Sequence, residues 1–400
     1  MDRFQLGWKL GTVGDCCTDA FTGKSPKYSK TKTEYRIIGQ QANQRYGIDL
    51  RYVKYGTTEF GDAQEDRFFL RYNDVILNTL GTGSIGRSGI YKRREPILTD
   101  GHPFVFRTSE ICLPDYLFHY LRYSEKQIID SASGSTNQRF LKLKSFLLFP
   151  IPIPPIDEQE RIVARIEELF SQLDAGVKTL KKTKAQLAVY RQAVLKEAFD
   201  SVSGAGAASI ESQCKNIVDC PHSTPKWSNE GYLCLRTTNF KRGRLDLSEK
   251  NYVTKETFDI RNARLIPLPG DVLYSREGAI LGIACIIPKD TYVCLGQRMM
   301  LLRAGERLNN KYLMYFLNSP AVTNYVASIT GGSASPHVNV GDIKAFMIPC
   351  PNITTQERIV LEIDSRFSVC DSIEQTVDTA LQQAEAMRQS ILKNAFEGGI

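Results

Sequence analysis

Glycines spaced as in a dinucleotide-binding loop are the first residues in this sequence that could do chemistry. Gly81, Gly83 and Gly86 give the spacing Gly-x-Gly-x-x-Gly, and they follow the strand-like run VILNTL that begins at Val75. Such a loop binds a pyrophosphate when a helix begins directly after it, because the helix N-terminus supplies amide donors. The residues after Gly86 read RSGIYKRREP, which is not a helical pattern. A tight strand-to-strand turn therefore fits this segment better than a cofactor site.

The other residue types that commonly carry catalysis or bind metals are scattered. The chain has 10 cysteines and 4 histidines, and no two cysteines form a Cys-x-x-Cys pair. Cys214, Cys220, His222 and Cys234 are close in sequence, but their spacing fits no common zinc pattern. The sequence also lacks a P-loop, a His-Glu-x-x-His motif and the Asn/Asp-Pro-Pro-aromatic motif of adenine methyltransferases. We therefore expect no catalytic residues, no metal site, no cofactor bound by this chain, and reduced thiols.

Two long helical segments organise the chain. Between Pro154 and Phe199, apolar residues recur every three or four positions, which predicts a helix. From Ile162 to Phe199 such a helix would be roughly 57 Å long, at 1.5 Å per residue. The segment returns 197 positions later without a gap, since QERIV at Gln159 is repeated at Gln356. We predict long spacer helices in 151–204, where a flexible Ser/Gly/Ala-rich linker follows the helix, and in 348–400.

The segments between the helices are duplicated as well. Asp74-Val75-Ile76 corresponds to Asp271-Val272-Leu273, and DYLFHYLRYS from Asp115 corresponds to KYLMYFLNS from Lys311. Each copy combines short strand-like runs with one amphipathic helix, which predicts mixed α/β domains over 1–150 and 205–347. We therefore predict an α+β protein in which two similar domains are joined by two long antiparallel helices, as a pseudo-two-fold internal repeat.

Positive charge is concentrated in the two predicted domains. Residues 1–150 contain 22 Lys and Arg against 16 Asp and Glu, and residues 205–347 contain 17 against 12. The first helical segment is neutral, and residues 348–400 carry 4 basic against 8 acidic side chains. This distribution favours domains that face a polyanion, although solvated surface lysines would give the same counts.

The order of these segments resembles the specificity subunit of type I restriction-modification enzymes over essentially the whole chain. The resemblance is carried by IPIPPIDEQERIV and IPCPNITTQERIV, by the helix ends Arg191–Phe199 and Arg388–Phe396, and by the glycine loops at Gly134 and Gly331. It implies two target recognition domains that each read one half of a split double-stranded DNA sequence. It also implies that the helices dock two methyltransferase subunits, which bind S-adenosylmethionine, and that restriction subunits can join the assembly.

An apolar stripe on each long helix predicts that the two helices pair. The residues that we expect in this seam are Ile166, Leu169, Leu173, Leu180, Ile363, Phe367, Val377 and Leu381. The stripe is interrupted at Lys184, which suggests that further helices pack beside the pair. Recognition domains held apart on such helices would address half-sites separated by roughly one to one and a half turns of DNA.

Candidate DNA contacts are basic, hydroxyl and amide side chains in predicted loops, where such groups bind phosphates and base edges. In the first domain they are Lys24, Lys27, Lys30, Lys32, Gln40, Gln41, Asn43, Arg45, Thr82, Ser84, Arg87, Gln138 and Arg139. In the second domain they are Lys226, Arg236, Thr238, Asn239, Lys241, Arg242, Arg276, Ser335 and His337. An ordinary solvated role remains open for each of them.

Two other functions remain open. The chain would be a coiled-coil scaffold or adaptor if its helices bound partners without sequence-specific DNA binding, and a self-contained transferase if the Gly81 loop held a cofactor. No apolar run reaches the ~20 residues that a membrane span needs, and the N-terminus has no signal-peptide pattern. We therefore expect no membrane association and a cytoplasmic location.

Overall fold

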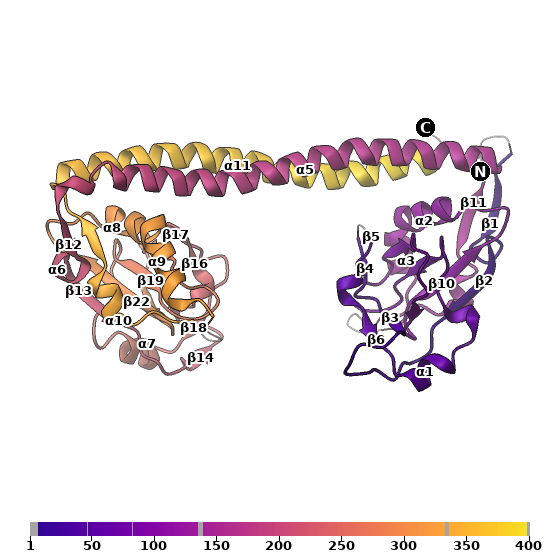
Figure 1. Ribbon diagram of the computed structural model, residues 1–400, viewed down its shortest axis with the longest axis horizontal. Helices are drawn as coiled ribbons and strands as arrows, with labels where there is room; N and C mark the ends of the chain where they lie inside the picture. The colour runs from indigo at the N-terminus through magenta and orange to yellow at the C-terminus, as the bar shows by residue number, and fades with distance from the viewer. Residues whose placement is uncertain (1–6, 46, 82, 135–138, 333–335, 398–400) are drawn as a thin grey trace. The chain divides into compact units, whose positions relative to one another are not determined.

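The protein is described by a computed structural model that covers residues 7–45, 47–81, 83–134, 139–332 and 336–397. It forms two compact units: unit 1 is Met1–Leu180 with Thr379–Ile400, and unit 2 is Lys181–Asp378. Each unit contains one α/β domain and a part of both long helices (Figure 1). We call the part of unit 1 that precedes its long helix domain 1, and the part of unit 2 between its two helical parts domain 2.

Domain 1 contains eleven short strands and four short α-helices in its described residues. The strands are β1 (Lys9–Thr12), β2 (Cys17–Thr22), β3 (Arg36–Ile38), β4 (Asn43–Gln44), β5 (Gly47–Ile48), β6 (Lys54–Tyr55), β7 (Val75–Leu77), β8 (Ser88–Ile90), β9 (Leu98–Thr99), β10 (Phe104–Thr108) and β11 (Pro150–Ile153). The helices are α1 (Thr58–Asp62), α2 (Pro114–Tyr123), α3 (Glu125–Asp130) and α4 (Leu143–Phe146).

An antiparallel sheet in the order β2-β10-β7-β8 forms the centre of domain 1. Alternation along its strands divides the core into two layers. Val75 and Phe106 point into the layer that contains α2 and the long helices, whereas Ile76 and Val105 point into the layer beneath the smaller sheet β6-β3-β9. Figure 1 shows α2 between the central sheet and the long helices of unit 1.

Domain 2 repeats this arrangement. Its strands are β12 (Ala207–Ser209), β13 (Cys214–Asp219), β14 (Trp227–Ser228), β15 (Tyr232–Leu235), β16 (Phe240–Lys241), β17 (Arg244–Leu245), β18 (Tyr252–Val253), β19 (Val272–Ser275), β20 (Ala284–Ile286), β21 (Val293–Leu295), β22 (Met299–Ala304) and β23 (Met347–Pro349). Its helices are α6 (Ile210–Gln213), α7 (Lys255–Arg261), α8 (Asn310–Leu317), α9 (Pro320–Thr330) and α10 (Val340–Ala345).

Strand pairing confirms the predicted internal repeat. The central sheet of domain 2 has the order β13-β22-β19-β20, which corresponds strand by strand to β2-β10-β7-β8. In both domains a parallel pair joins the second sheet, β3 with β9 and β15 with β21. The predicted α+β class is confirmed.

The connector after the first long helix is more ordered than its composition predicts. Residues 207–209 form β12, which pairs with β23, and Ser209 caps α6 by accepting a hydrogen bond from Ser212 N. Ile210 is fully buried. The small, almost uncharged side chains of DSVSGAGAASIESQ, residues 200–213, predict a flexible connector, but the backbone of residues 207–209 and the side chain of Ile210 are held by domain 2.

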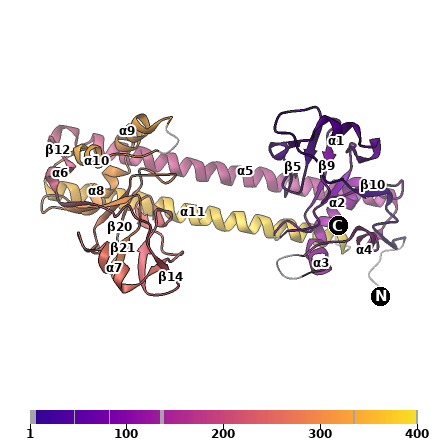
Figure 2. The same ribbon diagram turned by 90° about the horizontal axis from the view of Figure 1, so that it is seen from below.

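The long helices are α5 (Ile156–Asp200, 45 residues) and α11 (Ile353–Phe396, 44 residues). Figures 1 and 2 show them side by side and antiparallel in each unit. Of the predicted seam residues, Ile166, Ile363 and Val377 are buried and the other five are half-buried. Arg388 of α11 pairs with Asp174 in unit 1, and the equivalent Arg191 of α5 pairs with Asp371 in unit 2.

A buried glutamine fixes the start of each long helix. Gln159 Oε1 accepts a hydrogen bond from Leu113 N at 2.8 Å, and its Nε2 donates to Ile111 O at 2.8 Å and Pro154 O at 2.9 Å. Gln356 makes the same three bonds in unit 2, with Asn309 N, Arg307 O and Pro351 O. The repeated glutamine of the QERIV motif therefore joins each helix to its α/β domain.

None of the helices in the described parts of the chain is both long enough and apolar enough to cross a membrane.

Candidate nucleic-acid interface

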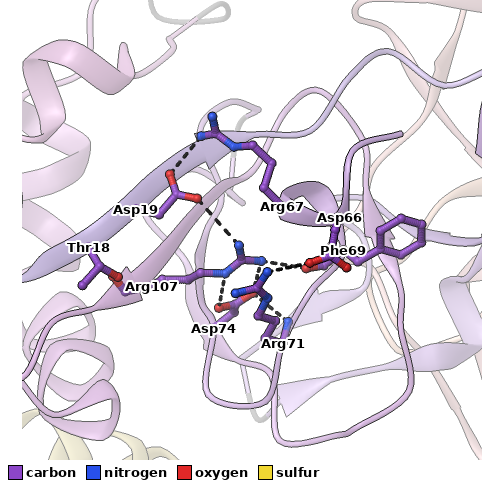
Figure 3. A network of polar contacts seen from close by, with 8 residues as sticks. All are labelled: Thr18, Asp19, Asp66, Arg67, Phe69, Arg71, Asp74 and Arg107. Carbon is purple, nitrogen blue, oxygen red and sulfur yellow. Dashed lines mark hydrogen bonds and ion pairs between the residues drawn. The ribbon is translucent and has the colours of Figure 1, made fainter. Parts of the chain in front are cut away.

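A repeated buried ion pair shapes the end of the central sheet in each domain. Arg107 Nε donates to Asp74 Oδ1 at 3.1 Å, and Arg107 Nη2 donates to Phe69 O at 2.7 Å (Figure 3). In domain 2, Arg303 Nε donates to Asp271 Oδ1 at 2.8 Å. Burial raises the pKa of Asp74, and the hydrogen bond from Arg107 opposes that rise. These arginines are not among the residues predicted from the sequence, although the repeated Asp-Val-Ile/Leu motif contains their partners.

Three of the polar segments predicted to contact DNA in domain 1 are held together by hydrogen bonds. Gln40 Oε1 accepts hydrogen bonds from Thr79 N at 2.9 Å and Leu80 N at 3.0 Å. Leu80 in turn forms an isolated bridge with Phe140. The loop after β3, the loop after β7 and the segment that follows residue 138 therefore form one surface.

Some candidates on this surface hold the loops together instead of facing solvent. Asn43 is 1% exposed, and its Nδ2 donates to Asn78 Oδ1 at 3.1 Å and to Arg87 O at 3.0 Å. Gln40 is half-buried with its carbonyl oxygen occupied, as described above. Arg87 Nη2 donates to Gly83 O at 2.7 Å. We correct the prediction for Asn43, because its side chain is buried and its amide nitrogen is bonded within the fold. The amide oxygen of Gln40 holds the loop after β7, and a DNA contact by the rest of its half-buried side chain stays a prediction.

Other candidates in domain 1 are accessible. Gln41, Arg45 and Arg139 are exposed, and Arg45 Nη1 lies 3.1 Å from Glu385 Oε1 of α11. Ser84 is half-buried and donates to Leu80 O. Thr82 and Gln138, like Ser335 in domain 2, lie outside the described residues.

The glycine motif is a turn. Gly81, Gly83 and Gly86 all have positive φ, and they connect β7 to β8, which pair antiparallel. Gly86 N donates to Asn78 O at 2.9 Å and closes the loop. The turn interpretation is therefore confirmed, because a strand and not a helix follows the glycines.

The basic loop of domain 1 is exposed. Lys24, Lys27, Lys30 and Lys32 are all exposed, and Lys24 Nζ lies 3.9 Å from Glu65 Oε1. Between them the ring of Tyr28 is 44% exposed, with Lys54 Nζ 4.8 Å from its centroid. Burial, followed by the nearby Asp100 carboxylate, raises the pKa of Tyr28. This loop offers cations and one aromatic face to a ligand.

Domain 2 brings its candidate loops together in the same way. Val338 N donates to Arg276 O at 2.9 Å, and Arg276 N donates to Arg298 O at 3.0 Å. The exposed candidates of this domain are Lys226, Arg236, Thr238, Lys241, Arg242 and His337.

Two candidates of domain 2 have structural roles, which corrects their prediction. Asn239 is 3% exposed, and its side chain bonds Arg236 N and the carbonyls of Asp246 and Glu249. Arg276 is 6% exposed and forms ion pairs with Asp219 at 2.8 Å and Glu277 at 2.7 Å. Buried polar atoms with such partners are not available to DNA.

The cysteines and histidines do not converge. Within the described ranges, no three His, Cys, Asp or Glu side chains are grouped so that they could hold a metal ion. Cys220 and Cys234 are buried free thiols, and burial raises the pKa of Cys220. His222 instead lies 3.1 Å from Asp219.

Comparison with known proteins identifies a family. The family model described as "Type I restriction modification DNA specificity domain" matches residues 5–187 and 218–383. The specificity subunit of the type I restriction enzyme EcoKI of Escherichia coli K12 is 26% identical over 315 residues, which cover 74% of this chain and 67% of that protein. The EcoBI specificity subunit of Escherichia coli is 26% identical over 306 residues, covering 68% and 62%. The matched region thus spans about two thirds of the length of these relatives.

Solved structures agree on the fold. A chain from a study of complex assembly and conformational transition of the type I R-M system superposes with a TM-score of 0.72 at 20% identity, covering 99% of both chains. The HsdS subunit of Thermoanaerobacter tengcongensis gives a TM-score of 0.50 at 20% identity, covering 99% of this chain and 98% of that one.

Proposed function

Because the chain belongs to the type I restriction-modification DNA specificity family, we propose that it reads a split, asymmetric double-stranded DNA sequence with one α/β domain on each half. The chain is a specificity subunit and not an enzyme, in agreement with the names of its relatives. Methylation and cleavage would be carried out by other chains.

The observation that supports DNA reading most directly is the exposed basic surface of each α/β domain. The lysines from Lys24 to Lys32 are exposed in domain 1, and the corresponding exposed cations of domain 2 include Lys226, Lys241 and Arg242. Phosphates are bound by such cations, and base edges by amide and guanidinium groups beside them. The two surfaces carry different residues, so the two half-sites should differ as well.

We further propose that the long helices dock two methyltransferase subunits, which bind S-adenosylmethionine, and that restriction subunits join through them. Several apolar side chains on α5 and α11 support this docking, because they are exposed in unit 2: Val189 is 71%, Leu361 68% and Val369 59% exposed. Since chromosomal DNA would be the substrate of the assembly, we propose the cytoplasm as its location.

The decisive experiment is methylation by the full chain co-purified with the methyltransferase of its own system. The assembly is incubated with labelled S-adenosylmethionine and a library of duplexes, and the modified adenines are mapped. We expect label in duplexes that share one interrupted sequence. Methylation without sequence preference would refute the proposal.

The scaffold alternative makes a different prediction for binding. A DNA reader neutralises phosphates, so its affinity must fall steeply as salt rises. Titration of the same assembly with a target duplex at about 50 and at about 200 mM salt separates the two functions. A protein that makes six phosphate contacts typically loses about a thousandfold in affinity over this range. Binding that does not change with salt would favour the scaffold.

A further inference from the structure

A hollow of about 220 Å³ opens on the surface of domain 2 where three of its loops meet. Its lining includes Thr224, Trp227, Arg236, Thr237, Gln297 and Arg298. The described residues that line it include no Asp or Glu. A polar, cationic hollow beside an exposed aromatic ring is suited to nucleic acid and unsuited to an apolar ligand.

The two arginines of this hollow are held in different ways. Arg236 Cζ lies 5.8 Å from the centroid of the Trp227 ring, which is 44% exposed. Arg298 has a φ of 67°, a left-handed conformation that a long side chain rarely adopts. A Cβ added to Gly278 would lie 3.2 Å from Arg298 Nη1, so this guanidinium lies directly over the backbone of the neighbouring loop. Arg298 thus combines an uncommon backbone conformation with a guanidinium that packs against the neighbouring loop.

Nearby acidic groups do not neutralise these arginines. The carboxylates of Asp219 and Glu277 are both held by the buried Arg276. Within the described residues, neither Arg236 nor Arg298 has a carboxylate within 4.0 Å. Their charges are therefore available to an anionic or electron-rich ligand.

A buried arginine fixes the walls of the hollow. Arg261 is 6% exposed, and its guanidinium donates to the carbonyls of Pro221, Ser223, Leu295 and Gly296. Pro221 and Ser223 lie just before Thr224, and Leu295, the last residue of β21, and Gly296 lie just before Gln297. Because its partners are all neutral, Arg261 also adds an uncompensated positive charge behind the site.

Domain 1 has a different surface at the equivalent place. In domain 2, Gly296 N donates a hydrogen bond to Leu235 O at 2.9 Å, and in domain 1, Asp100 N donates the equivalent bond to Ile38 O at 2.9 Å. Asp100 therefore occupies in domain 1 the position that Gly296 has in domain 2. Its carboxylate lies against Gly39, the counterpart of Arg236 at the offset of 197. An acidic group thus replaces the arginine hollow, and the hollow cannot be a grip on DNA that both domains share.

Resting on the proposed function, we propose that this hollow reads a guanine in the half-site of domain 2. Arg298 donates to guanine O6 and N7, the usual bidentate contact of arginine in the major groove. Arg236, whose Cζ lies 5.8 Å from the centroid of the Trp227 ring, contacts the adjacent phosphate. The half-site of domain 2 therefore contains at least one guanine that domain 1 has no means to read in this way.

The test uses the full assembly and its mapped target duplex. Each guanine of the second half-site is replaced in turn by 7-deazaguanine, which lacks the N7 acceptor. We expect one replacement to weaken binding by between about 10- and 150-fold, as for loss of one of the two charge-assisted hydrogen bonds, that to N7. In Arg298→Gly, which keeps the left-handed backbone without strain, that replacement should have no further effect. In Arg236→Ala, binding should weaken for all duplexes and keep its sequence preference.

Arg264→Ala is the matched control, since Arg264 is an exposed arginine of domain 2 that does not line this hollow. It should retain the wild-type sensitivity to 7-deazaguanine. The inference is overturned if Arg298→Gly keeps that sensitivity, or if no guanine replacement affects the wild type. A wild-type assembly that shows no split target at all would instead overturn the proposed function.

Discussion

Replacing Gln159 by alanine should destabilise unit 1 by about 3–5 kcal/mol. The side chain is fully buried and makes three hydrogen bonds to backbone groups. Alanine strands the Leu113 N–H, at a cost of about 1–3 kcal/mol for a buried donor, and removes two further bonds worth about 1 kcal/mol each. The first turn of α5 would then lose its attachment to domain 1.

The assay must distinguish the two units, because a chain with two compact units need not unfold in one step. Hydrogen exchange followed by peptide mass spectrometry does this. In Gln159→Ala we expect faster exchange in α2 and in the first turns of α5, with unit 2 unchanged. Gln356→Ala should give the reverse pattern, since it makes the same bonds in unit 2.

Gln172→Ala serves as the control. Gln172 is an exposed glutamine on the same helix. Among the described residues, its side chain forms one hydrogen bond, a long one of 3.4 Å from Nε2 to Glu168 Oε1. Its replacement should change stability by less than about 0.5 kcal/mol, as is usual at exposed positions. If Gln159→Ala behaved like Gln172→Ala, or accelerated exchange equally in both units, the buried glutamine would not be the attachment of the helix.

Four further predictions concern a buried histidine, a buried ion pair, the α/β domains and the long helices. Burial lowers the pKa of His119 to about 3, below the unfolded value of 6.5. Between these pH values the unfolded state binds more protons, so the stability of unit 1 falls as pH falls, by about 2 kcal/mol from pH 7 to pH 5. Urea titrations of His119→Phe should show a weaker dependence of stability on pH. Arg303→Met leaves the buried Asp271 carboxylate without its cation and should destabilise unit 2 by about 3–5 kcal/mol in the same urea titrations. Adding Asp271→Asn to this variant should recover part of the lost stability. Equal stability of the single and double variants would contradict the role of Arg303 in neutralising Asp271. Exchanging residues 1–150 for the corresponding domain of another family member should change only one half-site of the methylated sequence. Removing two turns from both long helices should shorten the spacer between the two half-sites. An unchanged spacer would show that the helices do not set its length.

The repeat and the long helices could be predicted from sequence because both are local patterns. Apolar spacing along one helix needs no information about partners, and a repeated QERIV motif is visible without a structure. The function of that motif was not visible, since the bonds of Gln159 go to residues 111 and 113, far away in sequence. Periodicity shows that a residue lies on a helix, but it does not identify which polar side chain is buried.

Candidate DNA contacts were harder to predict for the same reason. Asn43 and Arg276 are residue types that bind DNA, yet their partners lie at Arg87 and Asp219, more than 40 positions away. Only the folded loops show that these groups are already bonded. Arg298 was missed because its left-handed backbone and its position over Gly278 depend on how two loops meet.

The repeated residues and the differing residues of the two halves have separate roles. The buried groups that recur, namely the Arg–Asp pair at the sheet and the glutamine at the helix start, are bonded to backbone or to each other. The positions that differ, such as Asp100 against Gly296, lie in the loops that form the surface. Because the hydrogen bonds of these buried groups do not involve Asp100 or Gly296, one surface can change while the frame and the other surface keep their bonds. Under the proposed function, a target with two unlike halves follows directly from this separation.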